Sequence, residues 1–218
     1  MSTLVLIRHG ETADNARSVF QGQGGSCLNA RGREQATRVA ERLAAVHIDH
    51  LVSSDLERAV ETAHIIAART RVPLSLQDVA LREVDVGKWT NKSEAEIRAE
   101  LPEEWEAWIR GLDIPRGGGE TYRALGERLL GALERIARQH EDACVVVVSH
   151  GAAIRSAVGE ALSLTDEARR SLGPIANTSV TVMESRIEQA RMRFDLRMWN
   201  DVRHLDDPLP RLAARRGS

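Results

Sequence analysis

Two histidines in this chain directly follow apolar segments. Arg8 and His9 come after the apolar run at residues 4–7, and His150 comes after a second apolar run at residues 145–148. Both runs predict buried strands, and open α/β sheets bind their ligands at the carboxyl ends of parallel strands. We therefore expect the two imidazoles to share one pocket, where a histidine beside a permanent cation is suited to attack a phosphorus atom.

A third polar junction adds another cation to this expected pocket. Residues 53–58 follow a short apolar segment, and Arg58 lies at the start of a predicted helix for which Asp55 is the expected N-cap. Arg8, Arg58 and the two histidines together would bind a dianionic phosphoryl group. Each residue taken alone has a simpler interpretation, because a single histidine after a strand is usually a turn residue and a single arginine is usually a solvated charge or part of a surface ion pair.

Hydrophobic periodicity predicts the elements that position these residues. Strands and helices alternate along most of the chain, which predicts an α/β fold, a three-layer α/β/α sandwich with a largely parallel central sheet. The expected strands lie at residues 2–7, 50–52, 73–76 and 144–148, the expected helices at residues 31–45, 55–67, 93–100, 101–111, 120–140 and 152–162, and two edge strands, which can form a hairpin, at residues 178–183 and 191–199.

Length and composition limit the domain organisation and the classes of partner. The 218 residues predict one domain over residues 1–207, with an insertion at about residues 88–119 and a flexible tail at residues 208–218. The net charge of -2 argues against a general nucleic-acid-binding protein. No apolar run approaches the ~20 residues that span a bilayer and no signal peptide is visible, so we expect no membrane partner and a cytoplasmic location. The two cysteines are too few for a disulfide scaffold.

Six ordered motifs between about residue 4 and about residue 180 resemble the histidine phosphatase superfamily, which includes the cofactor-dependent phosphoglycerate mutases. The first motif, Leu6-Ile7-Arg8-His9-Gly10-Glu11-Thr12, resembles the signature of that family. The further matches are Asn15 with Phe20-Gln21-Gly22, Ser53-Ser54-Asp55-Leu56-Glu57-Arg58-Ala59, Leu81-Arg82-Glu83 with Gly87 and Trp89, Gly118-Gly119-Glu120-Thr121, and Val147-Val148-Ser149-His150-Gly151. The chain departs from the family pattern at residues 24–28 and at Asn91, outside the catalytic set.

The resemblance implies a metal-independent reaction through a phosphohistidine, with no cofactor. It implies that His9 attacks phosphorus, while Arg8, Arg58 and His150 hold the equatorial oxygens as charge spreads over them. The neighbouring cations are expected to keep His9 neutral, which is its reactive form.

The resemblance also implies a proton donor and additional substrate contacts. Glu83 is expected to protonate the leaving oxygen and then to deprotonate the attacking water, with Glu11 and Asp85 as nearby alternatives. The substrate-binding residues expected from the family pattern are Asn15, Gln21, Gly22, Gly151 and Arg82.

Mutases of this family are longer, with an extra insertion and an ordered tail, so the resemblance favours a phosphatase acting on a small phosphomonoester. A sugar phosphate, a phosphoglycerate derivative or a nucleotide would each fit. Residues 177–180 and 196–200 are similar in part to bacterial phosphatases of the glucosyl-3-phosphoglycerate type. A mutase-type phosphotransferase and a non-catalytic phosphate-ligand binding protein are the alternatives.

Side chains of the insertion and its surroundings are candidates for the substrate entrance. Tryptophans stack on sugars or bases and arginines bind a second anion, but two tryptophans can equally pack the insertion onto the domain. The candidates are Trp105, Trp108, Arg82, Arg116 and Arg123. The two expected edge strands could also pair between two copies of the chain in a homodimer.

Overall fold

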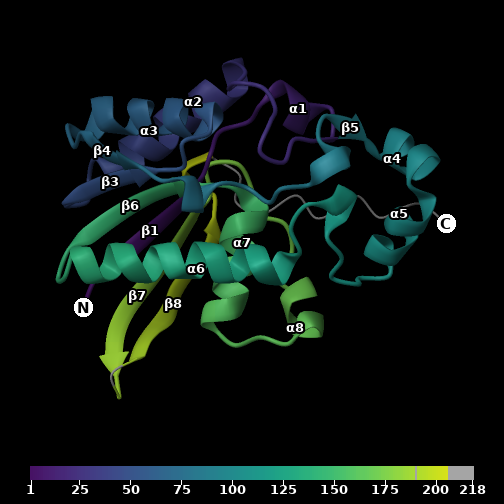
Figure 1. Cartoon of the computed structure of the whole chain (residues 1–218). Coiled ribbons are helices and arrows are strands. Elements are labelled where there is room, and N and C mark those ends of the chain that lie inside the picture. The colour runs from purple at the N-terminus through teal and green to yellow at the C-terminus, as the bar shows by residue number, and fades with distance from the viewer. Residues whose placement is uncertain (190, 206–218) are drawn as a thin grey trace.

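The computed structural model describes residues 1–189 and 191–205 of the chain. At its centre lies a six-stranded sheet with the strand order β4-β3-β6-β1-β7-β8 (Figure 1). The strands are β1 (Thr3–Arg8), β3 (His50–Ser53), β4 (Leu74–Gln77), β6 (Cys144–Ser149), β7 (Val180–Glu188) and β8 (Arg191–Asp201). The pairs β1–β6, β3–β6 and β3–β4 are parallel, whereas β7 and β8 join the sheet in antiparallel orientation. The predicted largely parallel sheet is therefore confirmed.

Helices cover both faces of the sheet, which confirms the three-layer architecture. The helices α2 (Ala30–Leu43) and α3 (Glu57–Thr70) pack on one face, and α6 (Tyr122–Gln139) and α7 (Gly151–Ala161) pack on the other. Alternate residues of β1 enter the two cores, since strand side chains point to opposite faces in turn. The four valines at residues 145–148 of β6 are fully buried, as expected for a central strand covered on both faces.

Several short elements complete the fold outside the central sheet. A two-stranded sheet pairs β2 (Val19–Phe20) with β5 (Lys92–Ser93) and so joins the loop after β1 to the segment at residues 88–119. The other short elements are α1 (Ala13–Ala16), α4 (Glu94–Glu100), α5 (Pro102–Ile109), α8 (Asp166–Arg170) and the 3₁₀ turns Val79–Leu81, Gly87–Trp89, Arg116–Gly118 and Arg203–Leu205.

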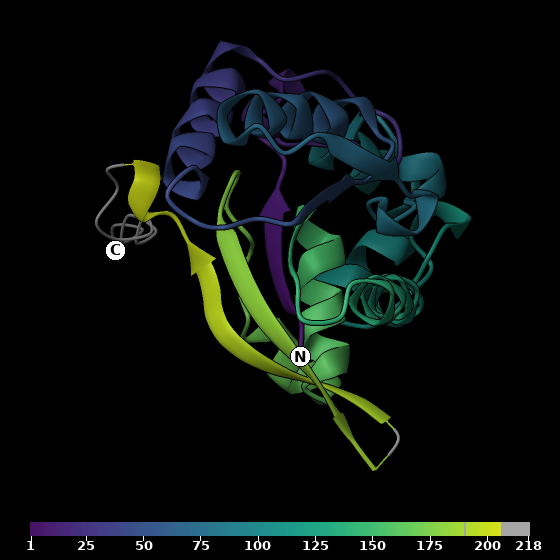
Figure 2. The same ribbon diagram turned by 90° about the vertical axis from the view of Figure 1, so that its left-hand side faces the viewer.

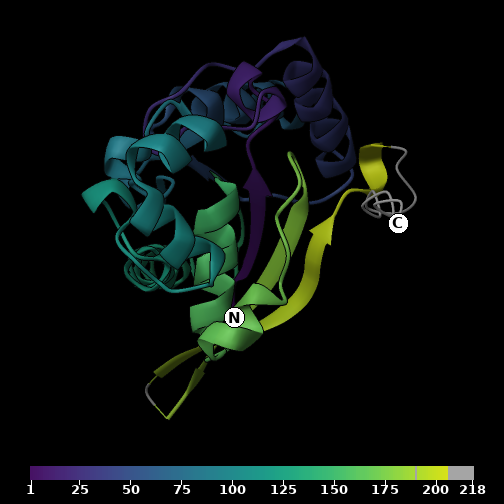
Figure 3. The same cartoon turned by 90° about the vertical axis from the view of Figure 1, so that its right-hand side faces the viewer.

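Two local expectations have different outcomes. The hairpin of β7 and β8 is confirmed, and it extends beyond the helical layers in Figures 2 and 3. The expectation that both are edge strands is wrong for β7, because β7 pairs with β1 on one side and with β8 on the other, so only β8 lies at the edge. The expected Asp55 cap is wrong: Leu56 occupies the N-cap of α3 without a side-chain hydrogen bond, because the Asp55 carboxylate instead binds Arg82. No helix among the described residues is both long and apolar enough to cross a membrane, and the predicted tail at 208–218 lies outside those residues.

Candidate active site

His9 lies at the carboxyl end of β1, where it is held on both sides of its ring. Its Nδ1 lies 2.7 Å from the Gly10 carbonyl oxygen. A carbonyl oxygen can only accept, so Nδ1 carries the proton and the other ring nitrogen, Nε2, is unprotonated and has a lone pair that can accept a hydrogen bond. Arg58 Nε donates to that Nε2 at 3.2 Å. The backbone therefore sets the tautomer in which Nε2 is the nucleophilic atom.

Burial and charge keep the His9 ring neutral. Its exposed fraction is 2%, and burial, followed by the charges of Arg58 and Arg8, lowers the pKa of His9 well below its ordinary value. The hydrogen bond to Gly10 acts in the opposite direction but is the smallest contribution. At neutral pH the imidazole is uncharged.

Arg58 reaches the site from the second residue of α3 and joins His9 to the loop after β1. Its NH2 donates to the Gly22 carbonyl oxygen at 2.8 Å, and its NH1 donates to the Gly24 carbonyl oxygen. Burial is the main cause that lowers the pKa of Arg58 to about 10, so the guanidinium is still charged at neutral pH. Gly22 is needed for this loop, because it has a positive φ of 54° and a Cβ there would lie 2.7 Å from a side-chain methyl of Val86.

Arg8 is the last residue of β1, and its guanidinium is anchored at one end only. Its NH1 donates to the Ile175 carbonyl oxygen, while the buried Nε has no partner among the described residues. Burial is the main cause that lowers the pKa of Arg8 from its ordinary value. Gly151 lies against this side chain, since a Cβ at Gly151 would be 3.3 Å from Arg8 Nε.

His150 follows β6 and lies beside His9 at a distance of 5.1 Å between ring centroids. It is fully buried, and its Nε2 lies 2.9 Å from the Ser54 hydroxyl at the end of β3. Its Nδ1 is buried and has no partner in the described part of the chain. Burial, then the Arg58 charge, lowers the pKa of His150 well below its ordinary value, so this ring is also neutral.

Glu83 is fixed by backbone amides at the start of α7. Its Oε1 accepts hydrogen bonds from the N–H groups of Val84 (2.9 Å) and Ala153 (3.0 Å), and its Oε2 accepts one from Ala152 (3.1 Å). Glu83 lines the same pocket as His9.

Asn15 belongs to α1, and Gln21 directly follows β2. Asn15 Oδ1 accepts from Thr12 N at 3.2 Å and from Asn177 Nδ2 at 3.3 Å, which leaves the Asn15 amide N–H groups as donors toward the pocket. Gln21 is buried, and its Oε1 has no partner among the residues that the structure describes. Both residues line the pocket.

One pocket of about 220 Å³ therefore collects most of the sequence-predicted site residues. Its lining includes Arg8, His9, Asn15, Gln21, Gly22, Arg58 and Glu83. Three predicted residues do not line it. His150 lies beside the His9 ring, Gly151 packs on Arg8, and Arg82 binds Asp55, with 2.7 Å between Arg82 Nε and Asp55 Oδ1.

The alternatives to Glu83 are held elsewhere. The Glu11 carboxylate accepts from Asn29 Nδ2 at 2.9 Å, and the Asp85 carboxylate accepts from Gly87 N at 2.8 Å. Neither residue lines the pocket. Among the three carboxylates, Glu83 alone lies beside the histidine.

The sequence did not identify two residues that position the histidines. Ser54 binds His150 as described, and Asn177 Nδ2 donates to the His9 carbonyl oxygen at 3.0 Å. Both residues lie in segments that match the family pattern, but their hydrogen bonds join positions 96 and 168 residues apart. Sequence spacing gives no signal for such contacts.

The aromatic residues of the insertion pack mainly on each other. Trp105 is 5% exposed and has ring centroids of Trp89 and Trp108 at 5.9 Å and 5.0 Å. Phe20 of the loop after β1 contacts this group edge-on, with 5.7 Å to Trp108. Trp105 thus packs the segment at residues 88–119 against Phe20 of β2, with 6.3 Å between the ring centroids. Trp108 also lines a neighbouring cavity of about 300 Å³, which contains neither histidine.

Comparison with known proteins agrees with this geometry. Residues 4–202 match the family model of the histidine phosphatase superfamily, branch 1. The chain is 40% identical over 211 residues to phosphoglycerate mutase-like protein 4 of Arabidopsis thaliana, covering 94% of this chain and 87% of that protein. It is 37% identical over 209 residues to a metal-independent phosphoserine phosphatase of the same plant, covering 94% and 84%.

Solved structures show the same fold over nearly the whole chain. A mycobacterial glucosyl-3-phosphoglycerate phosphatase superposes with a TM-score of 0.82 at 31% identity, covering 91% of this chain and 98% of that one. A phosphoserine phosphatase of Entamoeba histolytica bound to 3-phosphoglyceric acid superposes with a TM-score of 0.81 at 26% identity, covering 94% and 100%. The match over residues 4–202 and these identities show that the chain is an enzyme of branch 1 of the histidine phosphatase superfamily.

Proposed function

We propose that this protein is a metal-independent phosphatase that hydrolyses a small phosphomonoester through a phosphohistidine on His9. The observation that carries the proposal is the state of His9. Its Nδ1 donates to a carbonyl oxygen, its unprotonated Nε2 accepts a hydrogen bond from Arg58 Nε, and its lowered pKa keeps the ring neutral beside two arginines. A neutral nucleophile next to fixed cations is the arrangement that attack on a phosphate dianion requires.

In the first step, His9 Nε2 forms a bond to phosphorus as the bond to the ester oxygen breaks. Glu83 gives its proton to the leaving oxygen, so that an alcohol departs. In the second step, a water molecule attacks the phosphohistidine and gives a proton to the Glu83 carboxylate. The P–N bond breaks and inorganic phosphate is released. The amide anchors of Glu83 keep one carboxyl group in place for both transfers.

Charge stabilisation comes from the arginines and from the second histidine. Arg8 has an unpaired Nε and Arg58 lies against His9 Nε2, so both can bind the phosphoryl oxygens. If the Ser54 hydroxyl donates to His150 Nε2, then Nδ1 carries a proton and is a further donor. Donors held in a dry site before the reaction stabilise the transition state without reorganising. Asn15 and Gln21 add amide donors.

The pocket favours a small substrate. About 220 Å³ accommodates a phosphoryl group and a short alcohol portion, such as a sugar phosphate or a phosphoglycerate derivative. Similar proteins include phosphatases for phosphoserine and glucosyl-3-phosphoglycerate, which supports hydrolysis. Others carry phosphoglycerate mutase names, so phosphate transfer between positions of one substrate is the second candidate.

Phosphate release from a panel of phosphomonoesters, measured in EDTA, tests the proposal. We expect the wild type and a His47→Ala control, at a histidine whose side chain is 85% exposed, to release phosphate at equal rates. His9→Ala should release none, and a labelled substrate should leave acid-labile phosphate on the wild type only. Turnover by His9→Ala, or a requirement for metal, would refute the mechanism. Exchange between 2- and 3-phosphoglycerate without net phosphate release would instead identify a mutase.

A further inference from the structure

The three arginines expected near the substrate entrance have different environments. Arg82 binds the Asp55 carboxylate through two nitrogens. Arg123 is more than half exposed and forms an ion pair with Asp166 at 3.1 Å. Arg116 differs from both, because it is 3% exposed and has no ion pair among the described residues. Of the three, only Arg116 lines the pocket that contains His9.

The Arg116 guanidinium is only partly satisfied by the protein. Its NH1 donates to the Tyr122 hydroxyl at 3.0 Å, and its Cζ lies 4.1 Å from the centroid of that ring. Its Nε and NH2 are buried and have no hydrogen-bond partner among the described residues. A buried cation without a paired anion is costly, and buried unsatisfied groups in native proteins require an explanation.

The nearby carboxylates are engaged with other groups. Glu104 Oε2 accepts from Trp89 Nε1 at 3.1 Å and from Gly117 N at 2.8 Å. Burial acts to raise the pKa of Glu120, but the hydrogen bonds from Arg128 and, least of all, the charge of Arg116 lower it. Both oxygens of Glu120 are bound by Arg128, at 2.7 Å and 2.8 Å. Within the described part of the chain, therefore, no carboxylate binds the Nε or NH2 of Arg116.

The backbone around Arg116 is rigidly placed. Gly117 has a positive φ of 59°, and a Cβ at this position would lie 2.4 Å from the Val86 carbonyl oxygen. The turn at Arg116–Gly118 is thus pressed against the Gly87–Trp89 turn, with the Glu104 carboxylate joining them. The unsatisfied nitrogens belong to a side chain whose backbone cannot move away, which is what a preformed binding site requires.

We propose that Arg116, with the Tyr122 hydroxyl beside it, binds a second anionic group on the alcohol portion of the substrate, a carboxylate or a second phosphate. The inference rests on the proposed function and adds the substrate class. The transferred phosphoryl group already has Arg8 and Arg58, whereas Arg116 faces the same 220 Å³ pocket with an unfilled donor pair. The small volume places the second anion a few bonds from the phosphate ester. A guanidinium fork suits either anion.

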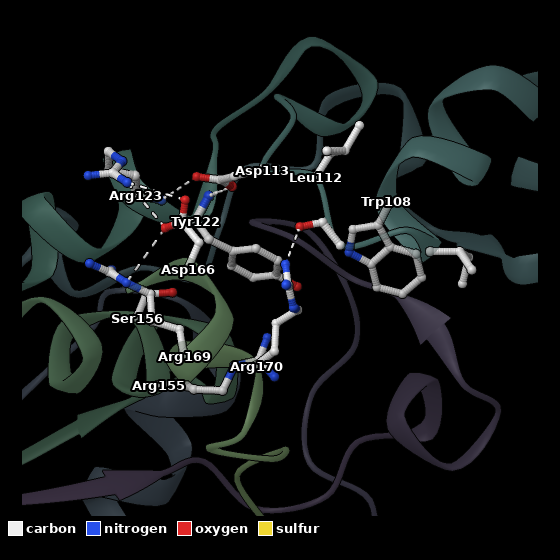
Figure 4. Close-up of a pocket in the computed structure, with 12 residues that line it drawn as sticks. Trp108, Leu112, Asp113, Tyr122, Arg123, Arg155, Ser156, Asp166, Arg169 and Arg170 are labelled. Carbon is white, nitrogen blue, oxygen red and sulfur yellow. Dashed lines mark hydrogen bonds and ion pairs between the residues drawn. The ribbon is translucent and has the colours of Figure 1, made fainter. Parts of the chain in front are cut away.

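The cavity on the other side of Tyr122 is a separate feature. Arg155 lies 5.2 Å from the Tyr122 ring centroid and lines that cavity together with Arg123, Arg169 and Arg170 (Figure 4). Arg169 is held by Glu160, and Arg170 donates to the Gly111 carbonyl oxygen at 2.8 Å. None of these four arginines lines the pocket of His9, so the prediction concerns Arg116 alone.

Paired substrates that differ only in the second anion give the test. 3-Phosphoglycerate and sn-glycerol 3-phosphate differ by a carboxylate in place of a hydroxymethyl group, and glycerol 1,3-bisphosphate supplies a phosphate instead. We expect the wild type to have a higher kcat/KM for one of the two acidic esters than for sn-glycerol 3-phosphate. Arg116→Gln should reduce that ratio by about 10- to 100-fold, the effect of one charge-assisted hydrogen-bonding group. Arg110→Gln, at an exposed arginine in the same segment, should keep the wild-type ratio. The acidic ester whose kcat/KM ratio falls in Arg116→Gln shows whether the bound anion is a carboxylate or a phosphate.

A binding measurement separates this inference from the proposed function. The Kd values of the same esters are measured by calorimetry in the His9→Ala background, with and without Arg116→Gln, so that no turnover is needed. If Arg116→Gln raises the Kd of the acidic ester but not that of sn-glycerol 3-phosphate, the result would support the role of Arg116 even if the wild type released no phosphate. An equal increase in the Kd of all esters would show a contact to the transferred phosphoryl group. A lower Tm together with equal losses of kcat/KM for all esters would show a structural role. Either result would overturn the inference. An unchanged ratio would also overturn it.

Discussion

Glu83→Gln should distinguish substrates by the basicity of their leaving groups. The carboxylate accepts three backbone N–H groups, and one of its oxygens receives the N–H of Ala152 at 3.1 Å. Glutamine keeps one acceptor oxygen but places an NH2 group opposite a backbone donor. It keeps the shape of the side chain but cannot transfer a proton. The substitution therefore tests proton transfer at one defined atom.

Two magnitudes follow from this geometry. Loss of a general acid reduces kcat/KM for an alkyl phosphate by about 10²- to 10⁴-fold, which corresponds to roughly 2.7–5.4 kcal/mol in the barrier. In Glu83→Gln, the glutamine NH2 group and the backbone N–H opposite it would both be donors without an acceptor, which lowers the free energy of unfolding by about 1–3 kcal/mol. An aryl phosphate has a weakly basic leaving oxygen that needs little protonation, so its kcat/KM should fall by less than about tenfold.

The assay compares sn-glycerol 3-phosphate with p-nitrophenyl phosphate in the wild type and in Glu83→Gln. Asp85→Asn is the matched control, because Asp85 lies two residues away and binds Gly87 N instead of α7. For the aryl ester we expect a burst of p-nitrophenol followed by slow turnover, since the second step still lacks its base. Equal losses of kcat/KM for the two esters would refute the role of Glu83 as the proton donor. Loss of activity in Asp85→Asn alone would assign the role to that residue.

Three further perturbations have defined outcomes. Gly10→Ala should lower the free energy of unfolding by about 1–3 kcal/mol in urea titrations, since its Cβ would lie 2.4 Å from a backbone oxygen of α2. Gly131→Ala in α6 is the control. The added Cβ would have no neighbouring side chain or distant backbone atom of the described residues within 4 Å, so this variant should raise the free energy of unfolding by up to about 1 kcal/mol. His9 and His150 have lowered pKa values in the folded protein, so below about pH 6.5 the unfolded state binds more protons than the folded state. The free energy of unfolding should therefore decrease with falling pH by up to about 1.4 kcal/mol per pH unit for each ring. A free energy of unfolding that stays constant from pH 7 to pH 5 would contradict this. Arg58→Lys keeps the charge but loses the fork that holds His9 Nε2 and the loop carbonyls, so steady-state kcat/KM should fall by about 10²- to 10³-fold, and a loss below threefold would show that charge alone suffices.

Much of the fold could be predicted because local patterns determine it. The valines at 145–148 predict a central strand from their own burial tendency, and the 3.6-residue period of α6 predicts a surface helix. Ser93 and Glu96 form a capping box at the start of α4, a motif that local sequence can specify because both partners lie within one turn. Asp55 shows the limit of this reasoning. The same carboxylate can cap a helix or bind an arginine 27 residues away, and local sequence does not decide between them.

Some features of the candidate site could also be predicted from local sequence, and others could not. Strand ends and adjacent glycines indicate where His9, Arg8 and Arg58 should meet, because parallel strands bring their carboxyl ends to one edge. The sequence could not distinguish Arg116 from Arg82 and Arg123. That distinction depends on which arginine has a carboxylate beside it and which is shielded from water.

The sequence by itself determined the order of the main strands and helices, the strand-end motifs and the kind of chemistry that two histidines and two arginines can perform, whereas the short elements α1, β2, β5 and α8 were not predicted. Only the tertiary structure decided the tautomer of His9, the partner of His150 and the unsatisfied state of Arg116. The physical reason is that strand and helix preferences arise from neighbours along the chain, whereas pKa values, hydrogen-bond partners and desolvation arise from groups that folding brings together across many residues.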